Sequence, residues 1–306
     1  MIARQISNNQ LLFLAVKDRL MGLRDLMGDE LFTVSSLMTP LSETLCVKRE
    51  ESYFLEEKAK KAKCGDFDNL PFWKNGELQG FVRVSDIHKH NYDLDAIPVM
   101  PIRSFSIDQR KTLHEAIDKI KACEAYHDNP VTDEPNLYFV TTEDGPVGVL
   151  TYADLNRKSC YVYSYIMLMS LEQALREAIE KAYSKIERKN AWMGKLRPGQ
   201  QNRLKGLSID QKESTLSCAG LEDMVVVVEN DPAVKKIWEM RYKGIGEETL
   251  DSAVKMRNRI AHPNKLLVPR NKRVDCIKGL SRFWKDMHAF VLEYDKNSRN
   301  PRAKVG

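Results

Sequence analysis

The sequence lacks a long hydrophobic run. The longest apolar stretch in its 306 residues, at positions 161–171, is interrupted by Ser164 and Ser170 and is shorter than the roughly 18–20 residues that cross a bilayer. The apolar run at positions 11–16 is followed by no small-residue cleavage site, unlike a signal peptide. We therefore expect no membrane span and no signal peptide.

Clustered cysteines and histidines are also missing. The six cysteines lie far apart, and neither Cys-x-x-Cys nor His-x-x-x-His occurs. This usage indicates neither a zinc site nor a disulfide framework. We expect no bound metal, and a reducing cytoplasm fits best.

The charge is unevenly divided along the chain. The composition is that of a globular protein, with 42% hydrophobic and 30% charged residues, and the length suits about two domains. The total charge is only +5, yet residues 1–155 carry −7 and residues 156–306 carry +12. The two halves are therefore expected to face different partners.

The acidic half contains an internal repeat. Residues 70–87 and 137–155 both predict a strand, a tight turn, a glycine, a second strand and an Asp that opens a helix. Gly80 corresponds to Gly148 and Asp86 to Asp154, so the period is 68 residues. Such a period predicts two similar units stacked on each other.

The repeat resembles a known family. Each copy follows a Met-Pro neighbourhood, at 37–40 and at 100–101, and the second ends in Gly148-x-x-Thr151-x-x-Asp154. These strings are similar to a tandem pair of CBS domains over residues 31–156. The resemblance implies βαββα copies at 31–90 and 91–156 and a regulatory ligand, which is an adenine nucleotide (ATP, ADP or AMP) or S-adenosylmethionine.

Thr151 and Asp154 are the main candidates for nucleotide binding. Three residues apart at a strand-to-helix junction, they lie beside free backbone N–H groups, where Asp can hold ribose hydroxyls and the amides can hold phosphate. The alternative is that Thr151 only caps the helix. In the first copy, Asp86 is matched but Arg83 replaces the Thr, so Arg83 either contacts a phosphate or is a solvated strand end.

The basic half is predicted to be an all-α bundle over residues 157–295. Apolar residues recur at helical spacing in several segments, whereas the polar stretch 194–214 indicates a basic loop. Helices are expected at 168–186, 216–228, 232–242, 247–261 and 275–294. An amphipathic helix at 1–30 should pack on the acidic half, and the basic tail 296–306 should be disordered.

One string contains candidate catalytic residues: Arg257-Asn258-Arg259-Ile260-Ala261-His262-Pro263. Pro263 should end the helix at His262, with Arg257 a little over one turn earlier. A cation and a titratable imidazole that flank a phosphodiester are the minimum for metal-free RNA cleavage. The alternative is a chance spacing in which His262 only terminates the helix.

The same string resembles the hallmark of the HEPN (higher eukaryotes and prokaryotes nucleotide-binding) family. Arg257, Asn258 and His262 match the pattern of Arg, a polar residue, three residues and His, near the end of a helix. The resemblance implies a metal-independent endoribonuclease that acts as a homodimer, with Arg257, Asn258 and His262 as catalytic residues. The expected fold is thus an α+β two-domain chain, with tandem CBS repeats and an all-α HEPN bundle.

Nearby basic residues fit an RNA substrate. Lys255, Arg259 and Lys265 are the nearest candidates for phosphate contacts, although each can equally belong to a solvated face. Trp192 and Tyr242 are the obvious candidates for base stacking.

Two kinds of function are consistent with these patterns. The first is a ribonuclease controlled by an adenine nucleotide. The second is a non-catalytic, nucleotide-sensing dimer that binds RNA or protein. A further version of the first is a toxin held inactive by a separate antitoxin, or a defence protein.

Overall fold

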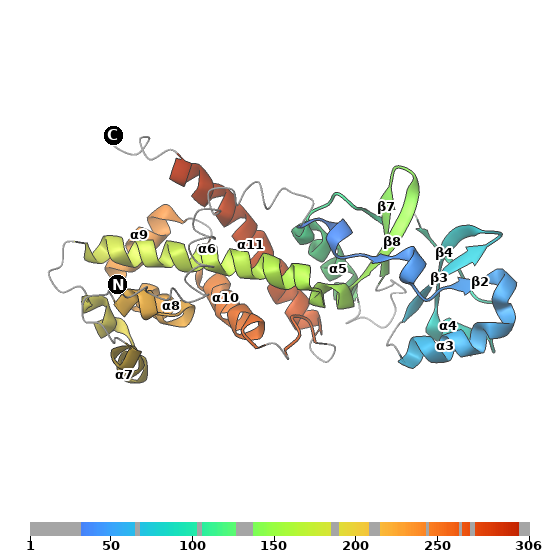
Figure 1. Ribbon diagram of the computed structural model, residues 1–306, viewed down its shortest axis with the longest axis horizontal. Coiled ribbons are helices and arrows are strands. Elements are labelled where there is room, and N and C mark those ends of the chain that lie inside the picture. The colour runs from blue at the N-terminus through green and yellow to red at the C-terminus, as the bar shows by residue number, and fades with distance from the viewer. Residues whose placement is uncertain are drawn as a thin grey trace, which may run out of the picture. The chain divides into compact units, whose positions relative to one another are not determined.

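In the computed structural model the chain forms two compact units (Figure 1). The sheet unit contains Asp29–Cys160 and Val268–Lys278, and the helical unit contains Tyr161–Leu267 and the residues from Gly279 onward. The residues whose structure is described are 32–64, 68–102, 106–126, 137–184, 190–207, 215–242, 245–262, 265–269 and 273–299. The helix expected at 1–30 lies outside them.

The sheet unit contains two four-stranded sheets. The first has the order β2-β3-β4-β5 and the second the order β1-β8-β7-β6. The strands are β1 (Thr39–Pro40), β2 (Val47–Lys48), β3 (Asn69–Lys74), β4 (Glu77–Arg83), β5 (Met100–Pro101), β6 (Ser106–Asp108), β7 (Leu137–Thr142) and β8 (Gly145–Thr151). Each sheet has one parallel pair followed by an antiparallel hairpin, so the two copies share one topology.

The βαββα order predicted for each copy is present. The helices are α3 (Leu55–Cys64), α4 (Val84–Lys89) and α5 (Leu113–Tyr126), with the short 3-10 helices η3 (Val34–Ser36), η4 (Leu41–Glu43), η5 (Arg49–Phe54) and η7 (Tyr152–Asn156). In the second copy, η7 stands where the first has α4. Phe81 and Phe139, with ring centroids 6.1 Å apart, pack the two hairpins together in one apolar cluster.

The two copies exchange strands. β1 lies near the start of the first copy but pairs with β8 of the second, and β5 lies near the start of the second copy but pairs with β4 of the first. The registers match, because Pro40 lies opposite Gly148 and Pro101 lies opposite Gly80. The repeated Met-Pro strings are therefore the exchanged strands.

The repeated glycines allow this exchange. A Cβ atom on Gly80 would lie 1.9 Å from the carbonyl oxygen of Met100. A Cβ atom on Gly148 would lie 2.7 Å from Sδ of Met38 and 2.9 Å from the carbonyl oxygen of Thr39. Since any side chain would displace the exchanged strand, both positions require glycine.

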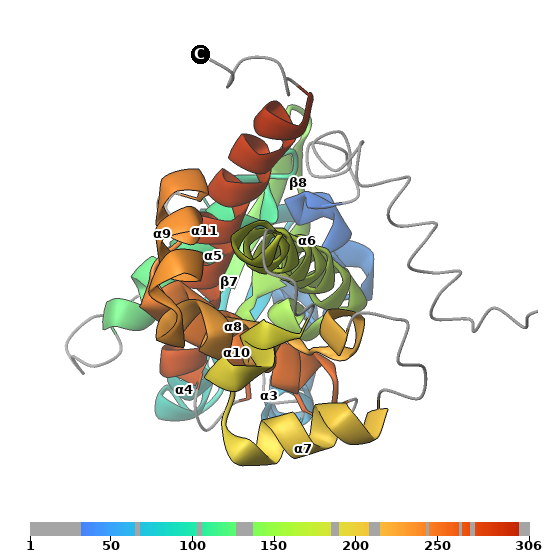
Figure 2. The same cartoon turned by 90° about the vertical axis from the view of Figure 1, so that its left-hand side faces the viewer.

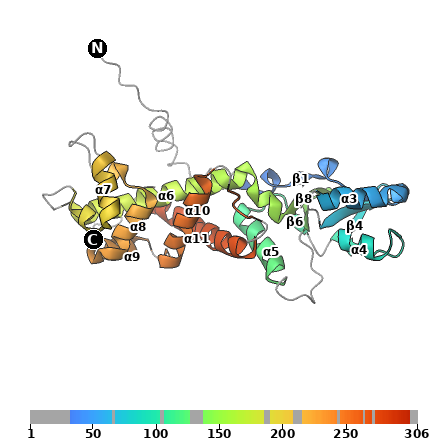
Figure 3. The same ribbon diagram turned by 90° about the horizontal axis from the view of Figure 1, so that it is seen from below.

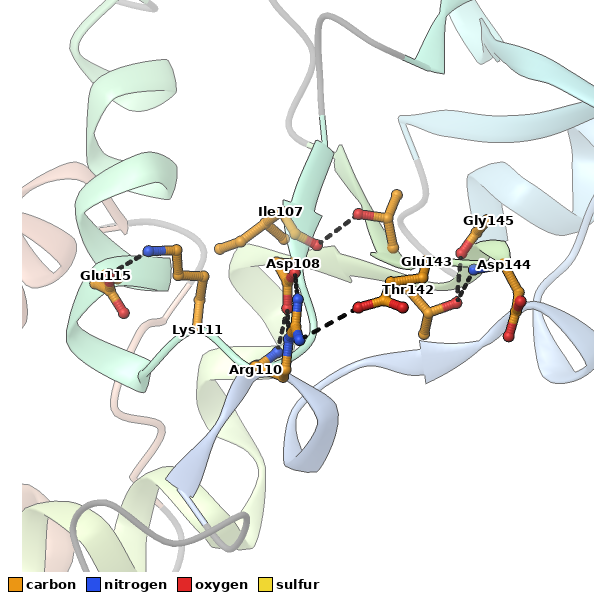
Figure 4. Close-up of polar contacts among 10 residues, drawn as sticks. Ile107, Asp108, Arg110, Lys111, Glu115, Thr142, Glu143, Asp144 and Gly145 are labelled. Carbon is orange, nitrogen blue, oxygen red and sulfur yellow. Dashed lines mark hydrogen bonds and ion pairs between the residues drawn. The ribbon is translucent and has the colours of Figure 1, made fainter.

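The carboxylate of Glu115 caps the start of helix α5. It accepts hydrogen bonds from the backbone N–H and the hydroxyl of Thr112, at 2.9 and 2.8 Å. It also accepts one from Lys111 Nζ at 2.8 Å (Figure 4). Burial alone would raise the pKa of Glu115, but these donors outweigh it and lower the pKa to about 2. The start of α5 is thus fixed by charge-assisted contacts.

A second polar cluster joins strand β6 to the β7–β8 turn. Arg110 Nη2 lies 2.8 Å from Asp108 Oδ2, and Arg110 Nη1 lies 3.6 Å from Glu143 Oε1 (Figure 4). The hydrogen bonds from Arg110 lower the pKa of Asp108 to about 2. Because these side chains are exposed, the cluster contributes little to stability.

The helical unit is built on two long helices. Its elements are α6 (Lys158–Tyr183), α7 (Pro198–Leu207), α8 (Leu221–Asn230), α9 (Pro232–Arg241), α10 (Glu247–Ile260) and α11 (Arg273–Arg299), with the 3-10 helices η8 (Ala191–Lys195) and η9 (Thr215–Cys218). Within this unit α6 and α11 lie side by side (Figure 3), because Trp284 packs edge-on against Tyr163 and its Nε1 donates to Ser164 Oγ at 2.8 Å. Trp284 and Phe283 are fully buried, as their helical spacing predicts.

Two sequence expectations for this half are wrong. The stretch 194–214 is predicted to be a loop, but it contains α7, which starts with Pro198 in the first turn and includes the helix formers Gln200, Arg203 and Leu204. The disordered tail was expected to start at 296, but α11 continues to Arg299. By contrast, α9 begins as predicted, with Pro232 in its first turn and Asp231 accepting from the backbone N–H of Ala233 at 2.9 Å.

No helix in the described part of the chain has both the length and the apolar character needed to cross a membrane.

The run of four valines at 225–228 is helical although its side chains are β-branched. All four of its valines are buried in α8, so tertiary packing outweighs their weak helix propensity.

We predict that Gly80→Ala lowers the free energy of unfolding by about 2 kcal/mol, because the new Cβ displaces strand β5. Urea denaturation measures the change. Gly206→Ala in α7 is the matched control, since nothing lies within 4 Å of its Cβ position. Equal stability of the two variants would show that the close approach is unimportant.

Candidate functional site

The predicted catalytic residues lie at the end of α10. Arg257 and Asn258 occupy its last turn and Ala261 is the C-cap, so His262 follows the helix directly. All three predicted residues are exposed. Among the described residues, none forms a hydrogen bond or ion pair with the side chain of Arg257, Asn258 or His262. Pro263 lies outside the described residues.

The side chains of Arg259 and Tyr161 hold the chain that follows the motif. Arg259 Nη1 donates to the carbonyl oxygen of Leu267 at 2.6 Å. The hydroxyl of Tyr161 donates to the carbonyl oxygen of Lys265 at 2.9 Å and accepts from the backbone N–H of Leu267 at 3.2 Å. Arg259, predicted to bind RNA, therefore also supports this loop.

A cavity of about 250 Å³ adjoins the motif. Its lining comes from α7, α8 and α10 of the helical unit. Figure 2 labels these three helices. Arg257 and Asn258 line it on α10, Arg203 on α7, and Glu222 and Asp223 in the first turn of α8. His262 is not part of its lining.

Asp223 forms the fixed wall of this cavity. Its side chain is 1% exposed and accepts hydrogen bonds from Gln200 Nε2 at 3.0 Å, from the backbone N–H of Gly220 at 2.9 Å, and from Arg203 Nη2. A buried carboxylate with three donors is stable only when all its partners remain in place. The contacts therefore hold α7 against the start of α8.

Glu172 on α6 is a charged neighbour of the motif that sequence reasoning missed. Burial raises its pKa, and the positive charges of Arg176 and Arg257 offset part of that rise. The half-buried carboxylate thus lies within electrostatic range of the motif arginine. Only its position on the helix face shared with Arg176, four residues later, could have suggested it.

The predicted stacking residues are not available to a base. Trp192 is 1% exposed and Tyr242 is 6% exposed. Tyr242 packs against Trp238 and Phe290 in the core, with ring centroids 4.6 and 5.4 Å away. The stacking prediction is therefore wrong, because these rings complete the hydrophobic core. Lys255 and Lys265 are exposed, as phosphate contacts require.

In the sheet unit, Asp154 is at the centre of a polar cluster. Its Oδ2 accepts from the backbone N–H and the hydroxyl of Thr151, at 2.7 and 3.0 Å. Its Oδ1 accepts from Arg157 Nε at 2.9 Å and from the hydroxyl of Thr39 at 3.2 Å. Arg157 Nη2 also donates to that hydroxyl at 2.6 Å. The chain itself thus occupies both carboxylate oxygens.

Burial dominates the electrostatics of Asp154. The residue is 7% exposed, and desolvation raises its pKa, against the lowering effect of Thr151 and Arg157. Thr151 is the N-cap of η7, so the capping interpretation describes its local geometry. Thr39 comes from the exchanged strand β1. It lies 115 residues before Asp154 in the sequence, so the sequence alone could not assign it to this site.

The equivalent position in the first copy is less buried. Arg83 is the N-cap of α4, and Asp86 lies in the first turn of that helix. Both side chains are half-buried. The corresponding carboxylates of the two copies therefore differ in exposure.

Within the described residues, no group of three or more His, Cys, Asp or Glu side chains is placed to hold a metal ion.

Comparison with known proteins gives structural neighbours. No protein-family profile and no curated protein matches the sequence. A hemolysin-like protein containing a CBS domain from Oenococcus oeni PSU matches 44% of the chain and 94% of its own, with 15% identity and a TM-score of 0.31. The CBS domain of a bacterial CNNM/CorC family Mg²⁺ transporter in complex with ATP matches 45% of the chain and 94% of its own, with 15% identity and a TM-score of 0.30.

Asp154→Asn should lower the free energy of unfolding by about 2 kcal/mol, because an amide cannot replace a carboxylate that accepts four hydrogen bonds. Thermal or urea denaturation measures the loss. Asp144→Asn, in the exposed β7–β8 turn, is the control and should leave stability unchanged. An Asp154→Asn variant as stable as the parent would mean that this cluster does not hold β1.

Proposed function

We propose that the chain is a metal-independent endoribonuclease whose activity responds to an adenine nucleotide bound by the sheet unit. The observation that carries the proposal is the end of α10, where Arg257 and Asn258 line a cavity and His262 follows the helix with an exposed side chain. A guanidinium, an amide and an imidazole with no partner among the described residues are available to a substrate.

The proposed reaction is an internal transphosphorylation of RNA. The 2′-oxygen attacks the adjacent phosphorus while His262 accepts its proton, and the P–O5′ bond breaks as an imidazolium protonates the leaving oxygen. The products are a 2′,3′-cyclic phosphate and a 5′-hydroxyl. Arg257 stabilises the negative charge of the five-coordinate phosphorus. In a homodimer, His262 of one copy accepts the proton and that of the other donates it.

The sheet unit supplies the proposed control. Asp154 accepts four hydrogen bonds from its own chain, so a ribose can bind it only if Thr39 and Arg157 release Oδ1. Binding ATP, ADP, AMP or S-adenosylmethionine would then move strand β1 or Arg157. Such a ligand changes activity only as far as its affinity differs between the two arrangements.

One observation favours the second candidate function, a non-catalytic dimerising regulator. On α6, Val162 is 49% exposed and Tyr165 is 43% exposed, and the two lie on the same helix face. Exposed apolar side chains next to each other favour a protein contact. A bundle that only dimerises would use this face and leave Arg257 and His262 without a catalytic role.

Cleavage of RNA in EDTA tests the proposed function. The purified full chain, incubated with total or transfer RNA, should release fragments that end in a 2′,3′-cyclic phosphate. His262→Ala should reduce the rate at least about 100-fold, because it removes proton transfer, and should leave RNA binding intact. Gel electrophoresis measures cleavage and filter binding measures affinity.

The matched control is His88→Ala, which changes an exposed histidine of the sheet unit. It should cleave at the parental rate. If the parent cuts nothing with or without ATP, AMP or S-adenosylmethionine, the proposal is wrong, and the dimeric regulator becomes the better account.

Calorimetry with adenine nucleotides tests the proposed sensor. Asp154→Asn should weaken binding about tenfold or more, because a neutral amide with one accepting oxygen is a weaker acceptor for the ribose hydroxyls than a carboxylate. Asp86→Asn, the same change in the first copy, is the matched comparison. Binding lost only in Asp86→Asn would place the nucleotide in the other copy and overturn the assignment.

A further inference from the structure

The cavity next to the motif has a lining of mixed charge. Arg203 and Arg257 are cationic, whereas Glu222 and Asp223 are anionic. Asp223 is buried and accepts hydrogen bonds from its own chain, but Glu222 is exposed and makes no hydrogen bond or ion pair with any described residue. A phosphate in this cavity would be repelled by a carboxylate.

The size of the cavity limits what it can hold. At about 250 Å³ it is smaller than the roughly 300–1,000 Å³ of pockets that take whole drug-sized ligands. It suits one flat heterocycle with polar edges. Because Arg257 and Asn258 belong both to the cavity and to the motif, an RNA with its phosphate at Arg257 brings an adjacent base to this cavity.

The unoccupied donors of Arg203 and the unoccupied acceptors of Glu222 favour one base over the others. The single recorded hydrogen bond of the Arg203 guanidinium, within the described residues, goes to Asp223, so its other N–H groups can donate to a ligand. Arginine pairs with O6 and N7 of guanine through two donors. The carboxylate of Glu222 can accept from two neighbouring donors, and guanine is the base that carries two on one edge, N1–H and the 2-amino group.

We propose that this cavity is the base-selecting subsite of the ribonuclease and that it takes guanine, with Glu222 on the N1–H and 2-amino edge and Arg203 on O6 and N7. The assignment rests on the proposed function, because it requires RNA as the ligand. Asn258 lines the same cavity beside Arg257.

Single-stranded 12-mers that differ at one position (G, A, C or U) in an otherwise uniform sequence test the proposal. Fluorescence anisotropy in EDTA measures their binding to full-length His262→Ala, which cannot cleave. The G-containing 12-mer should bind about tenfold more tightly than the other three, as expected for one good bidentate pair. With the parental chain, cleavage should occur next to the G.

Two variants assign the preference to Glu222. Glu222→Gln presents an amide N–H₂ to the base donors and should reduce the G preference to about one. Glu222→Asp keeps the charge but withdraws it by one methylene, so it should also lose most of the preference. Glu180→Gln, an exposed glutamate of α6 that does not line the cavity, is the control and should keep it.

The outcomes separate this inference from the proposed function. Cleavage or binding with no base preference, with a preference for A, C or U, or with a G preference unchanged in Glu222→Gln overturns the subsite alone. A G preference in binding without any cleavage overturns the nuclease and keeps the subsite. Absence of both binding and cleavage overturns both.

Discussion

The sheet unit depends on the close approach of two short Met-Pro strands to two glycines. Gly80 and Gly148 have no side chain, so strands β5 and β1 can cross from one copy to the other and pair with the opposite sheet. This contact also builds the candidate nucleotide site. It brings Thr39 of β1 to Asp154, where the hydroxyl accepts from Arg157 and donates to the carboxylate. The site is thus a consequence of strand exchange rather than of the Thr151-x-x-Asp154 string alone.

The charged groups of the two candidate sites differ in burial and in how many hydrogen bonds they already accept from the chain. Asp154 is buried and its oxygens are occupied by the chain, so a ligand there must compete with existing hydrogen bonds. Around the cavity of the helical unit, Asp223 is occupied in this manner, and it fixes the wall that carries Arg203. The exposed Arg257 and Glu222 exchange water for a ligand at little cost. A ligand at Asp154 must therefore rearrange the chain, whereas the exposed groups beside the cavity are accessible without such a rearrangement.

Much of the fold could be predicted because it depends on local rules. The repeat was visible from Gly80 and Gly148, and the start of α9 from Pro232. Helix α7 was missed because its polar residues and glycines look like a loop, although Pro198 suits a first turn. Trp192 and Tyr242 were misassigned because an aromatic ring has the same composition signal in a core as on a binding surface. The cavity could not be foreseen, since its lining residues come from separate helices.

The sequence by itself determined where each motif lies on its own element: Arg257 and Asn258 in the last helical turn, His262 just beyond it, and Thr151 at a strand end that caps a helix. Those features depend on interactions within about one turn of chain. Only the tertiary structure decided which polar groups are already satisfied. Arg259 supports the loop at Leu267, Asp154 holds Thr39, and Glu222 faces a cavity. The physical reason is that hydrogen-bond satisfaction and burial depend on partners brought together by folding, and no local pattern encodes them.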